Sequence, residues 1–410
     1  GRTVSHHYVM KYPKQRDDVS YGVPADWKPD ADSATSGIGN TVFFLKPTPG
    51  APNGSVLNGT VAKLAFSQPH GLYDEPFDLT ISTETPGVTL RYTTDGSVPT
   101  IDSGTVLEGG LLKMEKTTVL RVAGFKPGFK PTKVVTRTYL FPKDIVRQSP
   151  DGLPPNGFPY EWGFNYVDYG MDQRVVNDKR YKDRIFDGLR SLPSYSLVME
   201  MDDLFDEESG IFANAKNDGR EWERSCSLEM ISPDGESGFQ ENCGVRIRGG
   251  FSRMSPNAKH AFRFFFRSEY GPAKLQYPVF GKDAAQEFDN IDLRTFSNYS
   301  WSLSDDPRCT FMRDQFNRDM QFSLGQSTAR GHYCHLYING HYWGLFNVVE
   351  RPEASFGATY FKGKQDDFDV IKIGRGKGKG EGNTQYGLFA TDGSLDAWER
   401  FWKICKAGLE

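Results

Sequence analysis

Alternation of apolar and polar residues predicts that much of this chain is strand. Between about residues 62 and 142, segments such as AKLAFS, FDLTIS, TLRYTT, TVLRVAGF and KVVTRTYLF alternate in this way and are separated by short turns. A period of two is typical of half-buried strands, and the regular turn spacing indicates a small β-sandwich. Within it, Asp95-Gly96 lies between β-branched residues, which suits a tight hairpin turn.

A second patterned region begins near residue 191. It opens with YSLVME, continues through GVRIRGGFSR and KHAFRFFFR, and later contains HLYINGHYWGLFNVVER at 335–351, a hairpin with Asn339-Gly340 at its turn. Residues 309–324 place apolar side chains at helical spacing, and Gly325 follows as a helix stop. The region is therefore predicted to be a mixed α+β unit.

These patterns set the expected domain organisation of an α+β multidomain protein. Residues 1–53 lack apolar periodicity and lead into a linker-like stretch rich in Pro, Gly and Asn. We expect a sandwich at 62–142, a connector at 143–190 and a third unit at 191–410. The chain starts without Met and stops inside the amphipathic segment WERFWKICKAGLE, so we expect a fragment cut at both ends.

Composition and charge narrow the classes of function. The formal net charge is −4 and basic residues are mixed with acidic ones, so we expect no nucleic-acid partner. No apolar run approaches the roughly 18 residues of a membrane helix, so no membrane span is expected. The five cysteines include no CxxC pair, and their odd number excludes a complete set of intrachain disulfides. A structural metal is not expected.

The glycine pair in VRIRGGFSR is the first candidate for binding chemistry. Two arginines alternate with apolar residues on the preceding strand, and Arg248 leads directly into Gly249 and Gly250. A turn without Cβ atoms lets backbone N–H groups approach an anion, and Ser252 and Arg253 add donors beside it. A glycine bulge beside solvated arginines explains the same residues, so both interpretations stay open at this point.

Three further residues stand where a kinase small lobe would use them. Lys259 begins an apolar strand after the glycine turn, as a phosphate-pairing lysine does, although it would equally protect an edge strand from aggregation. Asp314 lies near the first turn of the predicted helix, where it either pairs with Lys259 or interacts with the helix dipole. Glu350 ends the hairpin before Pro352, which matches the passage into a kinase hinge; the alternative is a surface ion pair.

Two short motifs that look like metal sites are interpreted otherwise. In HYCH at 332–335, His332 and Cys334 would face one side of a strand and His335 the other, so the three side chains do not converge. The acidic DDFD at 366–369 has neither the glycine nor the spacing of an EF-hand loop. No metal ligand is therefore assigned in this chain.

Seven ordered motifs across about residues 190–400 resemble the CotH spore-coat kinase family. They are SLPSYSLVMEMDDLF, GVRIRGGFSR, NAKHAFRFFF, DLRTFSNYSW, RDQFNRDM, LYINGHYWGLFNVVER and DVIK. Members of this family look like atypical protein kinases that transfer the γ-phosphoryl group of ATP, with Mg²⁺, to Ser/Thr of secreted or coat proteins. The resemblance implies a kinase-like small lobe and the start of a large lobe, with Lys259 and Glu350 contacting the nucleotide.

The chain departs from this family in its last part. An Asn-x-Asp type catalytic segment and a Trp-Asp-x-Asp type metal-binding segment follow the corresponding region in the family, and neither occurs in residues 351–410. The resemblance therefore implies Mg²⁺ ligands beyond residue 410. We expect this fragment to be catalytically inactive, while the full-length protein is a kinase.

The N-terminal half carries two further resemblances. YTTDGSVPT at 92–100 and the following TTVLRVAGFKPGFKPTKVVTRTYLF resemble a chitobiase/hexosaminidase C-terminal domain, and QRDDVSYGV with TVFFLKPTPGAPN resembles the end of a bacterial lamin-tail domain. Both imply an extracellular or cell-surface protein, with surface or glycan contact through the sandwich. The competing hypothesis is a non-enzymatic surface scaffold or a carbohydrate-binding protein, and the protein substrate is not identified.

Overall fold

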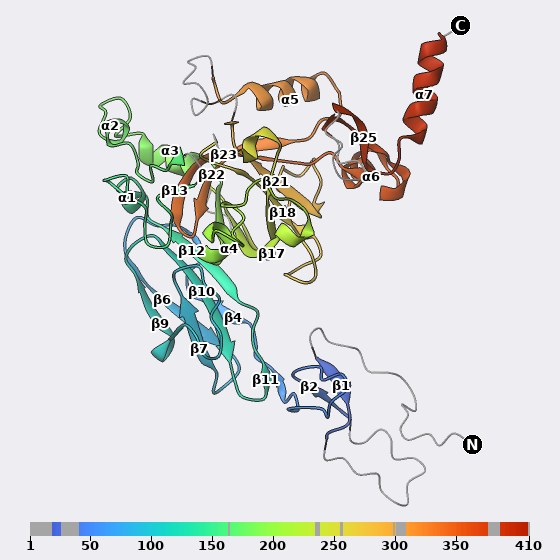
Figure 1. Ribbon diagram of the computed structural model, residues 1–410. Helices are drawn as coiled ribbons and strands as arrows, with labels where there is room; N and C mark the ends of the chain where they lie inside the picture. Colours follow the sequence, from blue (N-terminus) through green and yellow to red (C-terminus); the bar gives the residue numbers. More distant parts are fainter. Residues whose placement is uncertain are drawn as a thin grey trace, which may run out of the picture. The chain divides into compact units, whose positions relative to one another are not determined.

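The chain folds into two compact units, each rich in strands. The computed structural model describes residues 19–25, 41–162, 165–233, 238–254, 257–297, 300, 309–375 and 386–408. The first unit comprises Gly1–His70 and Glu75–Tyr139, and the second comprises Gly71–Asp74 and Leu140–Glu410 (Figure 1). Several sheets and fewer helices make up these units, which agrees with the predicted α+β multidomain class.

The first unit is built from short antiparallel strands. Its elements are β1 (Ser20–Gly22), β2 (Val42–Phe44), β3 (Gly59–Thr60), β4 (Leu64–Phe66), β6 (Phe77–Thr83), β7 (Thr89–Thr93), β8 (Thr105–Val106), η1 (Glu108–Gly110), β9 (Leu111–Met114), β10 (Thr118–Phe125), β11 (Phe129–Lys130) and β12 (Val135–Leu140). One sheet has the order β4-β6-β9, and another contains β12-β10-β7-β8. Buried residues of both sheets form the core, among them Leu79, Ile81, Leu90, Leu120, Val122 and Tyr139.

The turn at Asp95-Gly96 differs from the tight hairpin predicted for it. Strand β7 pairs with β8 through Arg91↔Val106, so residues 94–104 form a longer connection. Gly96 has a φ of +91°, and its carbonyl accepts a 2.6 Å hydrogen bond from the buried Arg121 guanidinium. The turn is thus shaped by a side chain on β10, a contact that local sequence does not show.

The second unit contains the remaining elements. They are β5 (Gly71–Leu72), α1 (Pro142–Ile145), β13 (Glu161–Trp162), β14 (Asn165–Tyr166), α2 (Gln173–Val176), α3 (Ile185–Ser191), β15 (Ser194–Val198), α4 (Met201–Phe205), η2 (Arg220–Trp222), β16 (Arg224–Ile231), β17 (Phe239–Arg248), η3 (Phe251–Arg253), β18 (Ala261–Phe265), β19 (Leu275–Gln276), β20 (Glu287–Phe288), β21 (Asn290–Arg294), α5 (Arg313–Ser323), β22 (Gly331–Ile338), β23 (His341–Val349), α6 (Ala354–Phe361), η5 (Gln365–Asp367), β24 (Val370–Arg375), β25 (Tyr386–Asp392) and α7 (Asp396–Ala407).

Seven of these strands close into a barrel. Their order is β15-β16-β17-β18-β21-β23-β22, and the ring is closed by a parallel pairing of β15 with β22. Alternate residues point inward and fill the barrel with apolar side chains, each contributing about 1.5–3 kcal/mol when fully buried. Buried inward-facing residues include Leu228, Val245, Ile247, Phe262, Phe264, Ile291, Leu293, Leu336, Phe346 and Val348.

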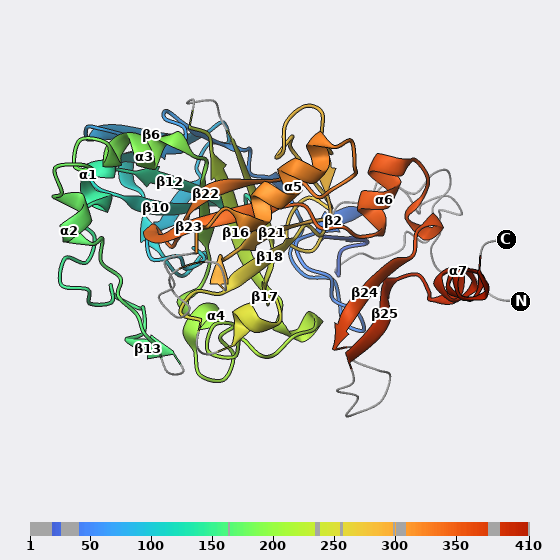
Figure 2. The ribbon, with the colours of Figure 1, turned by 90° about the horizontal axis from the view of Figure 1, so that it is seen from above.

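The predicted hairpin and helix are both present. Strands β22 and β23 pair antiparallel across a two-residue turn, with Asn339 and Gly340 at φ values of +46° and +81°, as a type I′ turn requires. Helix α5 lies beside these strands (Figure 2), where Gln315 accepts a 3.1 Å hydrogen bond from Asn347 of β23. This packing holds the N-terminal end of α5 next to the outer face of the barrel.

The ends of the predicted domains are only partly described. Of residues 1–53, expected to be the end of a lamin-tail domain, the structure describes 19–25 and 41–53, where β1 and β2 pair. The expected connector 143–190 carries short elements, and its Ile145 and Leu189 pack with Tyr337 of the barrel. Among the described helices, none is long and apolar enough to span a bilayer.

Candidate functional site

The outer face of the barrel carries a row of charged side chains on three neighbouring strands. Because Val245, Ile247, Phe262 and Leu293 point into the core, the residues between them point outward. The strand register places these outward residues side by side on β17, β18 and β21, with pairs Arg246↔Arg263, Arg248↔Ala261 and Arg263↔Asp292.

Asp292 is the buried centre of this row. Its side chain is only 4% exposed and accepts two hydrogen bonds from Arg263, Nε to Oδ1 at 2.6 Å and Nη2 to Oδ2 at 2.9 Å. Arg248 Nε lies 3.0 Å from Asp292 Oδ2. Two guanidinium groups thus share one carboxylate close to the glycine turn.

Arg248 retains unused hydrogen-bonding capacity. Its contact with Asp292 lacks hydrogen-bond geometry, and within the described part of the chain its buried Nε–H has no acceptor. Burial lowers the pKa of Arg248; the charges of Arg263, Arg294 and Arg253 lower it further, while Asp292 raises it. Arg248 is thus desolvated and paired with Asp292, and three other arginines act on its charge, so the interpretation as a solvated arginine does not hold for Arg248.

The turn at Gly249-Gly250 is held by contacts with Ser252 and Arg253. Gly249 has a φ of +107°, and a Cβ there would lie 2.0 Å from Ser252 Oγ, so no other residue fits. Arg253 donates to the carbonyls of Ile247, at 2.9 Å, and Asn217, at 3.1 Å. Gly250 has open space where a Cβ would be. The turn is thus rigid at Gly249 and accessible at Gly250.

An ion pair between β21 and helix α5 lies next to these arginines. It joins Asp314 to Arg294, a partner that the sequence did not reveal. Asp314, in the first turn of α5, pairs with Arg294 of β21 and accepts a 2.8 Å hydrogen bond from Arg318. The alternative in which Asp314 pairs with Lys259 is therefore wrong. Its place in the first turn agrees with the helix-dipole interpretation.

Lys259 instead packs against β23. Its Nζ donates to the carbonyl of Trp343 and lies 5.9 Å from the centroid of the Trp343 ring. A Cβ on Gly344 would lie 2.9 Å from this Nζ, so the glycine provides its space. The Lys259 residue as a whole is exposed, but desolvation of its ammonium lowers its pKa to about 8, against the raising effect of Asp168.

Glu350 is buried and hydrogen-bonded rather than part of a surface ion pair. It is 4% exposed, and its carboxylate accepts from the Arg330 amide at 2.8 Å and from the Tyr360 hydroxyl at 2.5 Å. Burial raises its pKa, which those two hydrogen bonds oppose. The ion pair at this point of the chain joins Arg351 and Glu353 instead.

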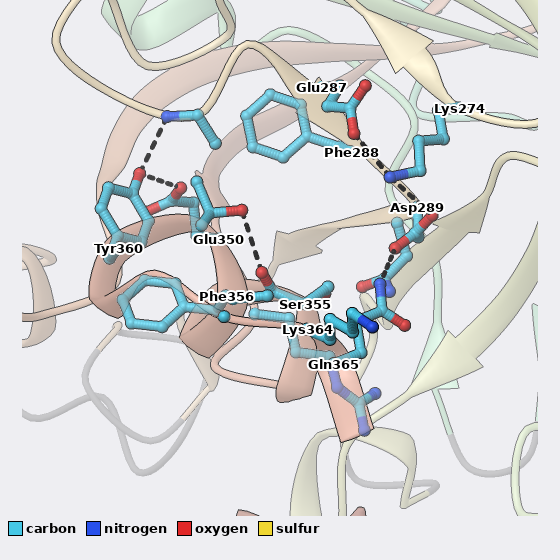
Figure 3. Close-up of a pocket in the computed structure, with 16 residues that line it drawn as sticks. Lys274, Glu287, Phe288, Asp289, Glu350, Ser355, Phe356, Tyr360, Lys364 and Gln365 are labelled. Carbon is cyan, nitrogen blue, oxygen red and sulfur yellow. Dashed lines mark hydrogen bonds and ion pairs between the residues drawn. The ribbon is translucent and has the colours of Figure 1, made fainter. Parts of the chain in front are cut away.

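A polar pocket lies next to Glu350, between α6 and the β19–β20 strands (Figure 3). Its volume is about 320 Å³. On one wall, Lys274 forms ion pairs with two carboxylates: its Nζ lies 2.6 Å from Glu287 Oε1 and 3.9 Å from Asp289 Oδ1. Tyr360 closes the opposite wall by bonding both Glu350 and the Ala285 amide. Charges of both signs line this pocket, whereas arginines predominate in the arginine cluster formed by Arg248, Arg263 and Arg294 with Asp292.

The structure therefore joins some of the predicted residues and separates others. Arg248, Gly249, Gly250, Ser252 and Arg253 lie together at the end of β17 and in η3. Asp314 reaches this group through Arg294, whose charge acts on Arg248, while Lys259 and Glu350 make separate contacts with β23 and α6. Sequence reasoning missed Arg263, Asp292 and Arg294. The alternation in IDLR, with apolar residues on one face and charged ones on the other, was the available signal.

The site residues fit the phosphate groups of a nucleotide better than they fit Mg²⁺. The Arg248 guanidinium, whose side chain is 24% exposed, and the open glycine turn fit phosphate oxygens. Asp292 and Asp314 are each held by two arginines, so neither fits Mg²⁺. Among the described residues, no group of three or more His, Cys, Asp or Glu is arranged to hold a metal ion.

Comparisons with known protein families bear on both units. Residues 245–403 match the family described as CotH kinase protein, and residues 68–136 match the chitobiase/β-hexosaminidase C-terminal domain. These matches confirm two of the resemblances in the sequence, whereas the lamin-tail resemblance of residues 1–53 stays a prediction. No curated protein matches the chain. The CotH match includes the whole arginine cluster, the strand-to-helix ion pair and the polar pocket.

Proposed function

We propose that the second unit is a kinase-related domain that binds the phosphate groups of ATP at the arginine cluster. In this proposal the barrel with α5 is the small lobe, and the residues from α6 onward begin the large lobe. The full-length protein then transfers the γ-phosphoryl group of ATP, with Mg²⁺, to Ser/Thr of secreted or surface proteins. The CotH match supports the reaction class, and the arrangement around Asp292 supports the phosphate site.

The observation that carries the phosphate site is the sharing of Asp292 by two arginines beside Gly249-Gly250. Asp292 is shared by both guanidinium groups, and the Arg248 side chain stays 24% exposed, so the remaining N–H groups of Arg248 are proposed to meet an incoming anion. Arginine presents several N–H groups in a fork that matches phosphate oxygens. Phosphoryl transfer depends mainly on such positioning and charge stabilisation.

The other residues of the site have supporting roles in this proposal. Asp292 orients Arg248 and Arg263, and the Arg294–Asp314 pair fixes α5 against β21, as a lysine-to-glutamate pair fixes the corresponding helix in kinases. Lys259 must leave the Trp343 carbonyl before its ammonium can reach a nucleotide. The backbone after Glu350 is proposed to face the adenine.

The Mg²⁺ ligands are proposed to come from another segment, because Asp292 and Asp314 are both occupied by arginines. The catalytic and metal-binding segments implied by the resemblance do not occur in residues 351–410. We therefore propose that this chain alone binds nucleotide without measurable phosphoryl transfer.

A second candidate function is a non-enzymatic surface scaffold. The saturation of Asp292 and Asp314 by arginines favours it, because a working kinase needs carboxylates that are free for metal. In either case we propose an extracellular or cell-surface location. The sandwich of the first unit is then proposed to act as a spacer or to contact surface glycans.

The test is calorimetric titration of the chain with ATP, comparing wild type, Arg248→Ala and Arg248→Lys. Loss of a charged hydrogen bond costs about 1.5–3 kcal/mol, so Arg248→Ala is expected to weaken binding roughly 10- to 150-fold. Arg248→Lys keeps the charge without the fork and should give an intermediate loss. Lys259→Ala should weaken binding less, since its ammonium is engaged with Trp343.

Arg174→Ala is the matched control, because the Arg174 side chain is 92% exposed and pairs only with Asp172 in the described structure. Tripolyphosphate should compete with ATP if the phosphates carry the binding. Equal affinities of wild type and Arg248→Ala would refute the arginine site. Absence of any ATP binding by wild type would favour the scaffold.

A further inference from the structure

Two cysteines face each other inside the barrel. Cys226 on β16 and Cys243 on β17 are directly opposite partners in the antiparallel ladder. Their Sγ atoms lie 3.6 Å apart, and the residues are 1% and 0% exposed. Both belong to the apolar core that fills the barrel, and both are thiols in the structure.

This placement is close to what a disulfide needs. A disulfide joins Cβ atoms about 3.5–4.5 Å apart, and directly opposite residues in an antiparallel pair have Cβ atoms about 4.5–5.5 Å apart. The sulfurs already point toward each other, so small side-chain rotations and a slight approach of the strands complete the geometry. The ladder on both sides of the pair keeps the register that places them opposite.

The remaining cysteines have no such partner among the described residues. Cys309 and Cys334 are buried and Cys405 is exposed. Cys334 shares the barrel core with the pair, on β22. The register of β22 places Cys334 opposite Phe346 rather than opposite a cysteine.

The pair is not reactive once the barrel has closed. Burial raises the pKa of the Cys243 thiol far above its ordinary value, and the neighbouring Cys226 raises it further. The thiolate is the attacking species in disulfide exchange, and neither sulfur is accessible to an oxidant. Oxidation must therefore occur while the strands pair, before the core is sealed.

We propose that Cys226 and Cys243 form a cross-strand disulfide when the chain folds in the presence of a disulfide oxidant such as oxidised glutathione. One cysteine thiolate attacks the oxidant, forms a mixed disulfide and releases one thiol. The second cysteine thiolate then attacks its neighbour's sulfur and releases the second thiol. The two cysteines lose two protons and two electrons, and the oxidant gains both to become two thiols.

The disulfide adds a covalent link between the two strands that lead to the glycine turn. It fixes the register of β17 on β16, and β17 ends at Arg248. The inference is independent of nucleotide binding, because it rests only on the positions of the two sulfurs. Once formed, the bond should resist reductants in the folded chain, since neither sulfur is exposed.

The experiment is refolding of the full 410-residue chain from denaturant, with and without a mixture of oxidised and reduced glutathione. Free thiols are then alkylated with iodoacetamide under denaturing conditions, and the intact mass is measured. Reduced protein should carry five alkyl groups, one for each cysteine. Oxidatively refolded protein should carry three and have lost two hydrogens, and peptide mapping should recover one linked pair, Cys226 to Cys243.

Two variants make the result specific. Cys405→Ser removes the exposed thiol, and its four cysteines should carry four alkyl groups when reduced and two after oxidative refolding. Cys243→Ala also has four cysteines, and all four should be alkylated under both conditions. Five alkyl groups on oxidatively refolded wild type would overturn the proposal. A linked peptide joining any other two cysteines would overturn it as well, and wild type alone decides this even if Cys243→Ala does not fold.

Discussion

Asp292→Asn tests the central feature of the candidate site. The substitution keeps the shape of the side chain but removes the charge that holds Arg248 and Arg263. The Asp292 side chain is 4% exposed, and those of its two partners are 24% and 17% exposed. We therefore expect a large loss of stability, because Arg248 and Arg263 lose the carboxylate that both contact, while Glu353 acts on Arg263.

The expected magnitude follows from this burial. Removing one partner of a buried ion pair costs about 3–5 kcal/mol, since the remaining charge stays desolvated. Here two charges remain, and they repel each other. For a unit of this size the loss lowers the unfolding midpoint by roughly 6–15 °C.

Tryptophan fluorescence during urea unfolding is the suitable assay. Trp162 and Trp343 are buried in the core cluster that fills the barrel, so a change in their fluorescence reports on unfolding of the second unit. Glu287→Gln is the matched control. It removes an ion pair with Lys274 whose side chains are 51% and 37% exposed, and it should cost no more than about 1 kcal/mol.

If Asp292→Asn loses no more stability than Glu287→Gln, the reasoning is refuted. That result would mean that water or rearrangement compensates the two arginines, and that the cluster is not under electrostatic strain. It would also remove the argument that Arg248 keeps unused binding capacity for phosphate.

Three further predictions concern residues around the site. Burial lowers the pKa of His260 from 6.5 to about 4, so the unfolded chain takes up this proton first and stability should fall as the pH drops from 6.5 toward 4. Urea midpoints of His260→Gln should show a shallower fall than wild type, because His332 and His341, whose pKa values burial also lowers to about 4, keep their contributions. Gly344→Ala should cost about 1–3 kcal/mol, because φ is +128° and the new methyl group meets Lys259 Nζ; an unchanged thermal midpoint would contradict this. Tyr360→Phe removes the hydroxyl that donates to Glu350, so unfolding measurements at pH 7 should show a loss of about 1–3 kcal/mol. The loss should become smaller as the pH falls through the pKa of Glu350, which burial raises.

Local features of the fold were predictable from the sequence. The hairpin at 335–351 follows from alternation and from Asn339-Gly340, whose positive φ values suit that turn. The helix expected at 309–324 is observed at Arg313–Ser323, because its apolar spacing is a local signal. The turn at Gly249-Gly250 was also predicted, because two adjacent glycines mark a place where the backbone adopts a conformation that other residues avoid.

Contacts between distant segments were not predictable in the same way. Asp314 was predicted either to pair with Lys259 or to interact with the helix dipole, and only the register of β21 against β23 places Arg294 beside α5. Lys259 was predicted to pair with phosphate or to protect an edge strand, but the missing side chain of Gly344 leaves room for its ammonium against β23. A single strand pattern shows which side chains point outward, but not which strand lies next to it.

Closure of the barrel by β15 and β22 has a consequence for where this domain can be divided. The family match starts at residue 245, after β15, β16 and most of β17. A shortened protein that began there would leave the remaining part of β17 and β22 as unpaired edges and would uncover the aromatic interior. Open apolar edges of this kind pair with other chains. The smallest piece that folds alone is thus set by the ring of strands and not by the span of recognisable family sequence, and it must begin no later than residue 194.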